Sequence, residues 1–274
     1  CLVCGPRPEQ PPALDGVLRR CASCGFGWTA SAPASPTELD DEAYYDGGGH
    51  EDDFLPRPRR FEASRRLRWL LSMARPGSLV EAGPAGGFFV EAARGADIDA
   101  SGVEVSPVAA RFARERLGVP VREGRFESFA PARRVDAVCA FQVLEHVEDP
   151  RAFLGTARET LVAGGWLALE VPNIASAGAR RLGAAWPKLQ PEHHRWHFTP
   201  ESLMRLVMQS GFHIVRHDTA FFRYYLPARY RWRHIHRLLR ADWAGTGSPR
   251  LTHPRLGDLL RIAARLPRNG RRIR

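Results

Sequence analysis

The feature that most limits the fold of this chain is an alternation, between residues 79 and 171, of short apolar runs with longer helical segments. The apolar runs occupy residues 79–82, 101–105, 135–140 and 166–171, and the helical segments occupy residues 88–95, 106–117 and 150–162. A helix that returns the chain between two buried strands makes those strands parallel. The sequence therefore predicts an α/β fold with a Rossmann-like, doubly wound and mainly parallel sheet.

Further elements are expected on both sides of this region. Residues 57–74 have helical periodicity, with an apolar face made of Phe61, Leu67, Leu70 and Leu71. Residues 119–124 predict a short third strand, and residues 200–219 predict a helix followed by a strand. The stretch 174–198 has few such signals and is interpreted as an insertion, because long irregular connections inside a domain are often lids or binding loops.

The same patterns divide the chain into four predicted units. Residues 1–30 form a cysteine-bearing module, residues 31–56 a linker rich in Pro, Ser, Gly and acids, residues 57–226 the main domain, and residues 227–274 a basic helical tail. The apolar face of the tail is expected to pack on the domain or on a partner, and it consists of Leu256, Leu259, Leu260, Ala263 and Leu266.

Composition places the chain among globular proteins, with 274 residues, 44% of them hydrophobic, and a net charge of +10. Such a charge suits nucleic acid or another polyanion, but acids and bases are interspersed and Lys188 is the only lysine, which is also typical of a solvated surface. No apolar run is long enough to span a membrane, and no signal peptide is visible. A cytoplasmic location is expected, although a trimmed leader before Cys1 stays open.

Four of the five cysteines stand in two pairs, CLVC at residues 1–4 and CASC at residues 21–24. This spacing is typical of a structural Zn²⁺ site, here with the ligands Cys1, Cys4, Cys21 and Cys24. Two disulfides are the alternative, but they require an oxidising compartment that nothing else indicates. We expect a small zinc ribbon, with Gly5 and Gly25 at positive φ after each pair. Cys139 is expected to be a small buried side chain.

Residues 80–94, VEAGPAGGFFVEAAR, predict a strand, a glycine-rich turn and a helix. Glycines let the backbone approach a ligand closely, and a helix start supplies unpaired N–H groups and the positive end of a dipole. An ordinary connection between a strand and a helix can contain the same residues, so this turn alone leaves both interpretations open.

In a doubly wound sheet, ligands collect at the carboxyl ends of the strands. The first strand ends near Glu81, and the second ends at Glu104, where a carboxylate can accept hydrogen bonds from both hydroxyls of a ribose. The third carries Phe126, whose ring offers apolar area to a flat base. The fourth runs into FQVLEHV at residues 141–147. Each residue also has a structural interpretation, but their order indicates one ligand site.

The ordered motifs resemble those of class I S-adenosylmethionine-dependent methyltransferases, in particular a bacterial group that carries a small zinc ribbon ahead of the catalytic domain. The matching segments are VEAGPAGGFF, GVEVSP, FQVLEHVEDP, GGWLALEVPN and PEHHRWHFTPESL. The resemblance covers nearly everything from Cys1 to about Val215. It implies S-adenosylmethionine as the cofactor and residues 57–226 as a class I methyltransferase domain.

The resemblance also implies which residues bind the cofactor: Glu81, Gly83, Ala85, Gly87, Glu104, Val105, Phe126, Phe141 and Gln142. Glu104 would hold the ribose, and Phe141 and Gln142 would flank the methionine moiety. Ala85 replaces the middle glycine of the family's first motif, and its methyl group is expected to crowd the cofactor. Arg125 stands where many relatives have an acid for the adenine amino group, so adenine recognition is expected to rest on Phe126 and backbone atoms.

Methyl transfer from a sulfonium to a hydroxyl needs an acceptor held in line and a base that removes its proton. Histidine suits this task at neutral pH. His146 follows the fourth strand, whereas His194 and His197 match paired histidines that the family has near HFT, and His193 is a further candidate. Each of these histidines can equally be a hydrogen-bonded structural residue.

Some relatives that methylate phenolic rings bind a divalent metal with acids around the LEH segment. Glu145 and His146 match that arrangement, but Gln142 stands where a further acid is expected. Because hard cations prefer several carboxylate oxygens, metal-dependent transfer is the less favoured alternative.

The sequence therefore predicts an S-adenosylmethionine-dependent methyltransferase that O-methylates a small molecule or glycan, namely a sugar or a secondary metabolite of natural-product biosynthesis. A second hypothesis is methylation of RNA bases, since some rRNA methyltransferases also join a zinc ribbon to this fold and the chain is basic. A strip of interleaved basic and aromatic residues, typical of RNA binding, is not evident. A third hypothesis is a non-catalytic scaffold that has lost cofactor binding, against which the retained acids and glycines argue.

Overall fold

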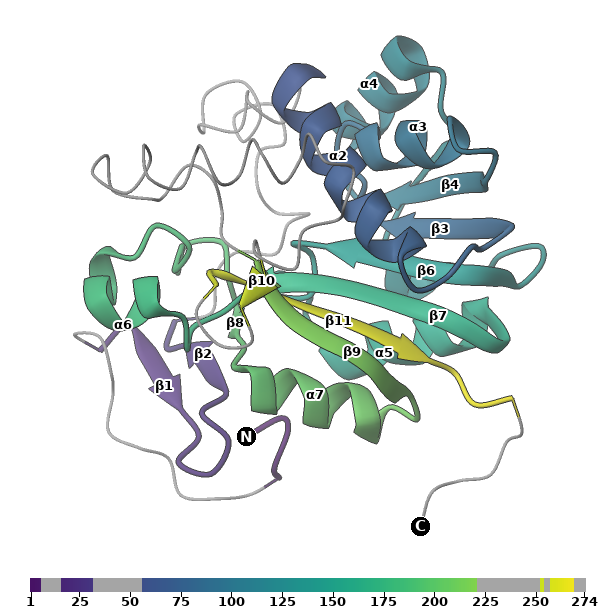
Figure 1. The fold of residues 1–274 in the computed structure, drawn as a ribbon. Coiled ribbons are helices and arrows are strands. Elements are labelled where there is room, and N and C mark those ends of the chain that lie inside the picture. The colour runs from purple at the N-terminus through teal and green to yellow at the C-terminus, as the bar shows by residue number, and fades with distance from the viewer. Residues whose placement is uncertain (6–15, 32–55, 221–251, 254–256, 269–274) are drawn as a thin grey trace.

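The computed structural model describes residues 1–5, 16–31, 56–220, 252–253 and 257–268. Within these ranges a large α/β domain carries a small sheet beside it, built partly from the N-terminal residues (Figure 1). Nearly all of the predicted linker, residues 32–55, and most of the predicted basic tail lie outside the described residues.

An eight-stranded sheet forms the middle of the large domain, in the order β10-β9-β11-β7-β6-β3-β4-β5. Its strands are β3 (Ser78–Ala82), β4 (Asp99–Glu104), β5 (Val121–Glu123), β6 (Val135–Phe141), β7 (Leu161–Pro172), β9 (His213–Ala220), β10 (Thr252–His253) and β11 (Leu259–Arg265). The five strands from β7 to β5 pair in parallel, and β11, β9 and β10 pair antiparallel. The predicted mainly parallel sheet is confirmed. Its order reverses at β3, which lies between β4 and β6, so a ligand crevice is expected at their carboxyl ends.

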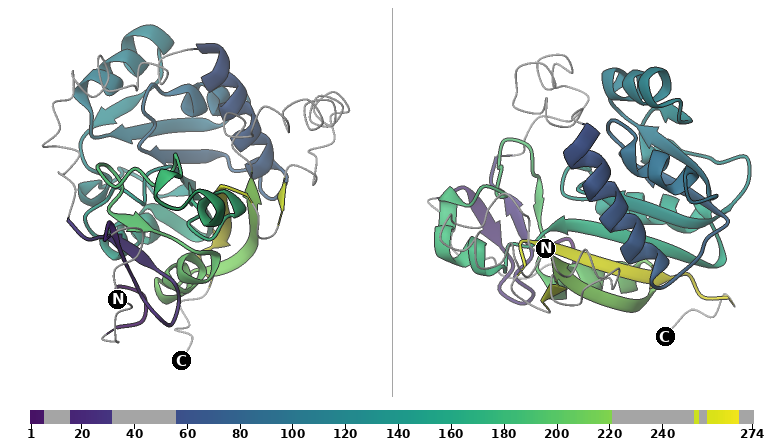
Figure 2. Two further views of the ribbon diagram at one scale, coloured as in Figure 1. Left: turned by 90° about the vertical axis from the view of Figure 1, so that its left-hand side faces the viewer. Right: turned by 45° about the horizontal axis from the view of Figure 1, so that its top comes forward.

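Helices cover both faces of this sheet (Figures 1 and 2). The first face carries α2 (Pro56–Leu71), α3 (Phe88–Arg94) and α4 (Pro107–Leu117), and the second carries α5 (Pro150–Thr160) and α7 (Pro200–Gln209). Ser106, Asp149 and Thr199 cap three of these helices by accepting a hydrogen bond from the first turn, and a proline follows each cap. No described helix is long and apolar enough to cross a membrane.

The core follows the twofold alternation of the strands. Val80 and Ala82 belong to the cluster that packs under α5 and α7, whereas Leu79 packs on the opposite face with α2 and α3. Cys139 belongs to the second cluster and is fully buried, as predicted. The burial of both faces explains why these strands appear in the sequence as continuous apolar runs.

Residues 259–265 form strand β11 and not the predicted amphipathic helix. The strand lies between β7 and β9 and pairs with both, so its backbone is hydrogen-bonded on two sides. A short apolar run is compatible with the periodicity of a helix and with that of a strand, and here the pairing with β7 and β9 makes it a strand. In the predicted helix, Arg261 would lie on the polar, exposed face. In the strand it is buried, donates a hydrogen bond to Asp218 Oδ1 at 2.7 Å and lies over the Trp69 ring. The sheet of the large domain therefore includes residues beyond 226, where the predicted domain ends.

Helix α2 differs from expectation at one position of its predicted apolar face. Leu67 and Leu70 are buried, but Phe61 is 36% exposed, and the guanidinium of Arg65 lies 5.8 Å from its ring centre. The helix is strongly polar, so its buried stripe is narrower than the periodicity indicates.

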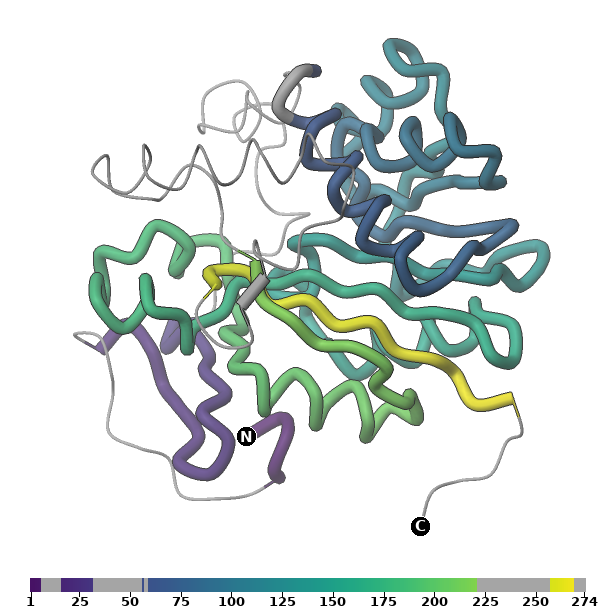
Figure 3. The backbone as a smooth tube through the Cα atoms, viewed as in Figure 1, coloured from purple at the N-terminus to yellow at the C-terminus, as the bar shows by residue number. Residues whose placement is uncertain are grey.

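The insertion 174–198 contains α6 (Ala177–Leu182), a 3-10 turn η3 (Gly183–Ala185) and β8 (Trp196–His197). Strand β8 pairs with β2 (Gly27–Thr29), which pairs with β1 (Leu18–Arg20). One three-stranded sheet thus contains two strands of the N-terminal module and one of the insertion. The backbone trace shows the N-terminal module beside the main body of the chain (Figure 3). The N-terminal module therefore shares a sheet with the insertion of the main domain.

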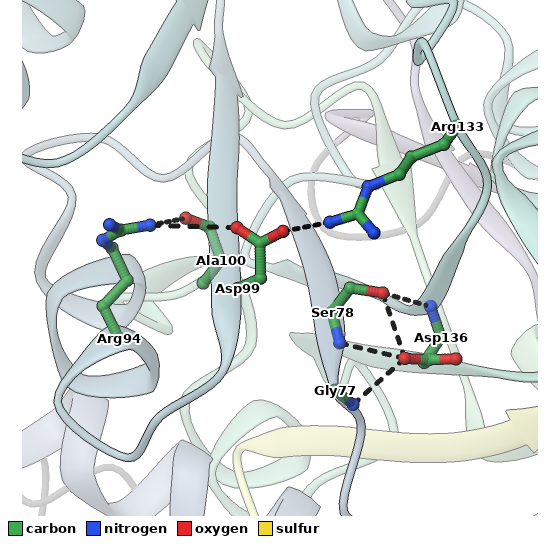
Figure 4. A network of polar contacts seen from close by, with 7 residues as sticks. All are labelled: Gly77, Ser78, Arg94, Asp99, Ala100, Arg133 and Asp136. Carbon is green, nitrogen blue, oxygen red and sulfur yellow. Dashed lines mark hydrogen bonds and ion pairs between the residues drawn. The ribbon is translucent and has the colours of Figure 1, made fainter.

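Polar contacts fix the amino ends of the parallel strands (Figure 4). Asp136 Oδ2 accepts hydrogen bonds from the backbone N–H groups of Gly77 and Ser78 at 3.0 and 2.9 Å, and from the Ser78 hydroxyl at 3.0 Å. Nearby, Asp99 pairs with Arg133. These contacts lie at the opposite end of the strands from the expected ligand crevice, so we interpret them as structural.

Candidate functional site

A cavity opens at the carboxyl ends of β3, β4 and β6, where the sheet order reverses. Its walls come from the turns after these strands, from α2 and from the insertion. All the predicted cofactor residues except Gly87 line it: Glu81, Gly83, Ala85, Glu104, Val105, Phe126, Phe141 and Gln142. The topology thus brings together residues that are up to 61 positions apart in the sequence (142 minus 81).

The glycine-rich turn between β3 and α3 has a backbone that needs glycine. Gly83 has φ +64°, and a Cβ there would lie 2.6 Å from Val143 Cγ2. Gly87 has φ +83°, and a Cβ there would lie 2.8 Å from Ala113 Cβ of α4. Gly83 therefore keeps the cavity wall close to the turn after β6, whereas Gly87 lets α3 and α4 pack together.

Ala85, the departure from the family motif, adopts φ +46°, a left-handed conformation that costs a non-glycine residue energy. Its N–H donates a 2.8 Å hydrogen bond to Glu104 Oε2, which helps to hold the turn in this conformation. Glu104 Oε1 accepts a second bond, from the backbone N–H of Ser106 at 2.9 Å. Glu104 is 4% exposed, so its carboxylate is a fixed group that joins the glycine turn to the end of β4.

Glu81 lies at the base of the cavity and is almost fully buried. Burial raises the pKa of its carboxyl to about 8, an effect that Arg66 opposes and Glu104 reinforces. Its Oε2 atom has no hydrogen-bond partner within the described part of the chain. A buried carboxylate oxygen without a donor is costly, and a cationic or N–H-bearing ligand in the cavity would satisfy it.

The cavity wall formed by the turn after β5 is aromatic. Phe126, in the 3-10 turn η2 (Phe126–Ser128), is buried against the rings of Phe129 and Phe153, with centroid distances of 5.9 and 4.8 Å. Arg125, which stands in place of the family's acid, extends to Glu148 with an N–O distance of 3.0 Å. Both members of this pair line the cavity, so an acid is supplied near this position by Glu148.

The turn after β6 has a strained residue at the cavity wall. Gln142 has φ +60°, and its N–H donates a 2.7 Å hydrogen bond to the Glu170 carbonyl. Its side-chain Nε2 lacks an acceptor among the residues that the structure describes. The Phe141 ring lies next to it, with the guanidinium of Arg66 at 4.9 Å from the ring centre. Backbone strain of this kind at a cavity is typical of a functional site.

The sequence patterns missed a buried ion network between α2 and β7. Arg66 binds Glu170 Oε1 at 2.6 Å and Glu62 Oε1 at 2.9 Å. Burial alone would lower the pKa of Arg66, but the carboxylates of Glu170 and Glu62 raise it above its usual value. Arg66 is one of several arginines in RPRRFEASRRLR, and no spacing signal distinguishes the inward one. This network places a fixed positive charge beside Glu81 and Phe141.

The predicted histidine bases occupy different depths. His146 and His193 line the cavity, whereas His194 and His197 lie behind them and are 3% exposed. The rings of His146 and His194 meet edge to face at 4.7 Å, and those of His194 and His197 are 6.4 Å apart. His146 Nδ1 lies 3.1 Å from the His193 carbonyl oxygen. Because a carbonyl only accepts, Nδ1 carries the proton of the neutral ring, and Nε2 carries its lone pair.

Burial disfavours a positive charge on the two deeper rings. It lowers the pKa of His194 well below its usual range, with a further contribution from His146. It also lowers the pKa of His197 to about 3, with a further contribution from Arg20. Both rings are therefore neutral at physiological pH, and of the four candidate histidines His146 and His193 are the two that line the cavity.

Among the described residues, two groups of side chains have the geometry of metal sites. The ligand atoms of Glu145, His146 and His194 lie within 4.8 Å of one another, and both Glu145 oxygens lack a hydrogen-bond partner within the described ranges. Burial raises the pKa of Glu145 to about 8. Two nitrogens and one carboxylate are a donor set for Zn²⁺ or Fe²⁺ more than for Mg²⁺.

The other group consists of the four N-terminal thiols: Cys1, Cys4, Cys21 and Cys24. Their sulfurs all lie within 4.8 Å of one another, and Cys1 Sγ is 3.8 Å from Cys24 Sγ. A tetrahedral ion with bonds of about 2.3 Å to sulfur has edges of about 3.8 Å, so this set fits Zn²⁺. Gly5 and Gly25 have φ +76° and +68°, as predicted for the two knuckles.

A family profile described as "Methyltransferase domain" matches residues 57–217, more than half of the chain. The chain belongs to this methyltransferase family. The predicted enzyme class, a methyltransferase, is thereby confirmed. A methyltransferase from Archaeoglobus fulgidus, described as SAM dependent, superposes with a TM-score of 0.55 at 16% identity, covering 76% of this chain and 94% of that one. Likeness at this level of identity shows a common fold.

Two curated relatives are described as ubiquinone biosynthesis O-methyltransferases. The one from Cereibacter sphaeroides is 31% identical over 145 residues, which cover 48% of this chain and 59% of that relative. The one from a Methylobacterium species is 32% identical over 170 residues, which cover 57% of this chain and 66% of that relative. This chain thus spans about three fifths of the length of the first relative.

Proposed function

We propose that this methyltransferase binds S-adenosylmethionine in the cavity and methylates a hydroxyl group of a small molecule or glycan, such as a sugar or a secondary metabolite of natural-product biosynthesis. The observation that carries the proposal is the pair of buried acids at the switch point, Glu81 with an oxygen that lacks a donor among the described residues and Glu104 fixed beside the glycine turn. The curated relatives, described as O-methyltransferases, favour oxygen as the accepting atom.

The cavity residues fit the parts of this cofactor. Glu104 would accept hydrogen bonds from the ribose hydroxyls, Phe126 would cover the adenine, and Glu81 would face the positively charged methionine end. Bound there, the cofactor would supply a methyl group on a sulfonium that needs little further activation. Catalysis by the protein then consists of positioning the acceptor, excluding water and receiving the acceptor's proton.

His146 is the proposed base. It lies at the cavity surface, and its Nδ1–H is directed to the His193 carbonyl, which leaves Nε2 as the nitrogen that can receive a proton. In this proposal, Nε2 takes the proton from the acceptor hydroxyl as oxygen attacks the methyl group. His194 supports the ring of His146 from behind and stays neutral because it is buried.

The thiol cluster is proposed to hold a structural Zn²⁺ through Cys1, Cys4, Cys21 and Cys24. Four thiolates complete a tetrahedral coordination sphere and leave no position for a substrate. Reduced thiolates of this kind suit a reducing compartment, so we place the protein in the cytoplasm. Methyl transfer itself is proposed to proceed without Mg²⁺, because two of the three ligand atoms in the cluster of Glu145, His146 and His194 are nitrogens, whereas Mg²⁺ prefers oxygens.

Calorimetric titration of the purified, zinc-loaded protein with S-adenosylmethionine and with S-adenosylhomocysteine tests the cofactor. We expect dissociation constants in the micromolar range or below, followed by methyl transfer to at least one member of a panel of hydroxylated sugars and natural products. Absence of heat and of any thermal shift with both compounds would contradict the proposal and favour a non-catalytic scaffold. Binding of RNA with a steep salt dependence, and its methylation, would favour the RNA hypothesis.

Replacement of His146 by glutamine should lower kcat by about 10²-fold to 10⁴-fold, the range typical of losing a general base, while the cofactor Kd changes little. The amide can still donate toward the His193 carbonyl but cannot accept a proton at neutral pH. His213→Gln, at an exposed position at the start of β9, is the matched control and should retain full activity. Turnover of His146→Gln equal to that of the control would remove His146 as the base.

A further inference from the structure

The N-terminal ribbon is attached to the segment that carries the histidines. In the three-stranded sheet, Gly27 is opposite His197 and Trp28 is opposite Trp196. The Thr29 N–H continues this pairing with a 3.1 Å hydrogen bond to the Arg195 carbonyl. Strand β2 of the ribbon therefore fixes the backbone of residues 195–197 from one side.

The turn after β6 holds the same segment from the other side. The Glu145 carbonyl accepts hydrogen bonds from the N–H groups of Arg195 and Trp196 at 2.9 and 3.1 Å. The Trp196 indole donates to the Val147 carbonyl at 2.7 Å, and its ring stacks on Phe26 of the ribbon at 5.6 Å. The histidine segment is thus held between the ribbon and the turn that carries His146.

Thr29 is the ribbon residue whose side chain contacts this segment at its histidines. Its hydroxyl lies 2.5 Å from the His194 carbonyl oxygen and 2.9 Å from His197 Nε2. A hydroxyl has one proton and a carbonyl only accepts, so the proton goes to the carbonyl and the hydroxyl oxygen accepts from His197 Nε2–H. This single buried group fixes both the His194 carbonyl and the tautomer of His197.

The carbonyl that Thr29 holds is one peptide away from the carbonyl that orients the proposed base. The His193 carbonyl accepts from His146 Nδ1 at 3.1 Å, and the next carbonyl, that of His194, accepts from Thr29. The His194 ring in turn directs Nδ1 to the Lys188 carbonyl at 3.1 Å and meets the His146 ring at 4.7 Å. Movement of this segment would displace these two contacts of the His146 ring.

We propose that Thr29 of the ribbon is a positioning residue for methyl transfer, which fixes the 194–195 peptide, next to the His193 carbonyl, and thereby the orientation of His146 at the cavity. The proposal rests on the proposed role of His146. It assigns a reason for joining the ribbon to the domain, since the ribbon supplies a hydroxyl that the insertion lacks at this point.

The thiol cluster is linked to the same position. Cys24, at the second knuckle, accepts a 2.9 Å hydrogen bond at its carbonyl from the Thr199 hydroxyl, two residues after His197. Phe26, two residues after Cys24, is fully buried against Trp196 and Phe198. The ribbon therefore contacts the segment at successive points from Arg195 to Thr199.

The test compares Thr29→Val, which keeps the shape and removes the hydroxyl, with Thr29→Ser, which restores it. Thr160→Val is the matched control, because Thr160 is also buried but its hydroxyl has no partner in the described residues. We expect Thr29→Val to lower kcat by about 10-fold to 100-fold and to alter the rate–pH profile, with the KM for S-adenosylmethionine nearly unchanged. Thr29→Ser and Thr160→Val should resemble the wild type.

Side-chain ¹H–¹⁵N spectra of the histidines provide a readout that needs no acceptor. In the wild type, Thr29→Ser and Thr160→Val, His197 should show the Nε2–H tautomer and His146 the Nδ1–H tautomer. In Thr29→Val, or in Thr29→Ala if the valine variant does not fold, both histidines should lose their single tautomer. Spectra identical to those of the wild type would overturn the proposal.

The two proposals fail in different ways. A wild-type protein that binds neither S-adenosylmethionine nor S-adenosylhomocysteine contradicts the proposed function, whatever the spectra show. A wild-type protein that transfers methyl groups, together with a Thr29→Val variant of unchanged kcat and pH profile, contradicts the positioning role alone.

Discussion

Replacement of Glu104 by alanine is expected to weaken S-adenosylhomocysteine binding by at least about 100-fold, measured by calorimetry. The ribose hydroxyls would lose their charge-assisted hydrogen bonds to the carboxylate, each worth about 1.5–3 kcal/mol. A loss of about 1.4 kcal/mol corresponds to a factor of ten in Kd. The variant would also lose the bond from the Ala85 N–H to Oε2 at 2.8 Å. That bond supports a left-handed alanine in the turn, so the wall of the cavity should loosen as well.

Two comparisons separate the carboxylate from general damage. Glu104→Gln keeps the shape but directs an NH₂ group at one of the two backbone donors, from Ala85 or Ser106, so its affinity should lie between those of wild type and Glu104→Ala. Glu123→Ala, in the neighbouring strand and opposite Glu104 in register, removes an exposed carboxylate and should bind normally. Circular dichroism should show the folded state in all three. Unchanged affinity in Glu104→Ala would exclude the ribose role.

The fold could be predicted because its main signal is local. The strands β3, β4, β6 and β7 are buried on both faces, so each one stands out as an apolar run between helical segments. Proline after a capping residue marks the starts of α4, α5 and α7. Strand β11 could not be predicted in this way, since its pairing with β7 and β9 depends on strands 87 and 39 residues or more upstream (259 minus 172 and 259 minus 220).

The sequence predicts the acids near the glycine turn well, and it predicts the arrangement of the histidines less well. Glu81 and Glu104 end consecutive strands, and topology alone brings such ends together. The roles of His194 and His197 depend instead on their depth, which the sequence does not indicate, because both lie behind His146 against the ribbon. Arg66 is similarly hidden among other arginines of α2, although its contacts with Glu62 and Glu170 place it beside the cavity.

Replacement of Cys21 by serine is expected to abolish stoichiometric zinc binding and to lower Tm by roughly 10 °C or more. Cys21 is 2% exposed within the thiol cluster, and serine is not a competent ligand in a site of four thiolates. Metal binding is coupled to folding in such small modules, and for a domain of this size each kcal/mol corresponds to about 2–4 °C in Tm. Because β2 pairs with β8, methyl transfer should fall together with zinc content.

Metal analysis, thiol titration and calorimetry on Cys21→Ser and on Cys139→Ala provide the comparison. Cys139 is buried in β6, away from the cluster, so its variant should keep one zinc ion per chain and its effect on Tm should reflect a small packing loss. One zinc ion per wild-type chain, released by acidification as the thiolates become protonated, is the expected result. A zinc-free wild type without titratable thiols at the four positions would show two disulfides instead. In that case the coupling between the ribbon and His146 would depend on oxidation, and reduction should then lower activity where chelation does not.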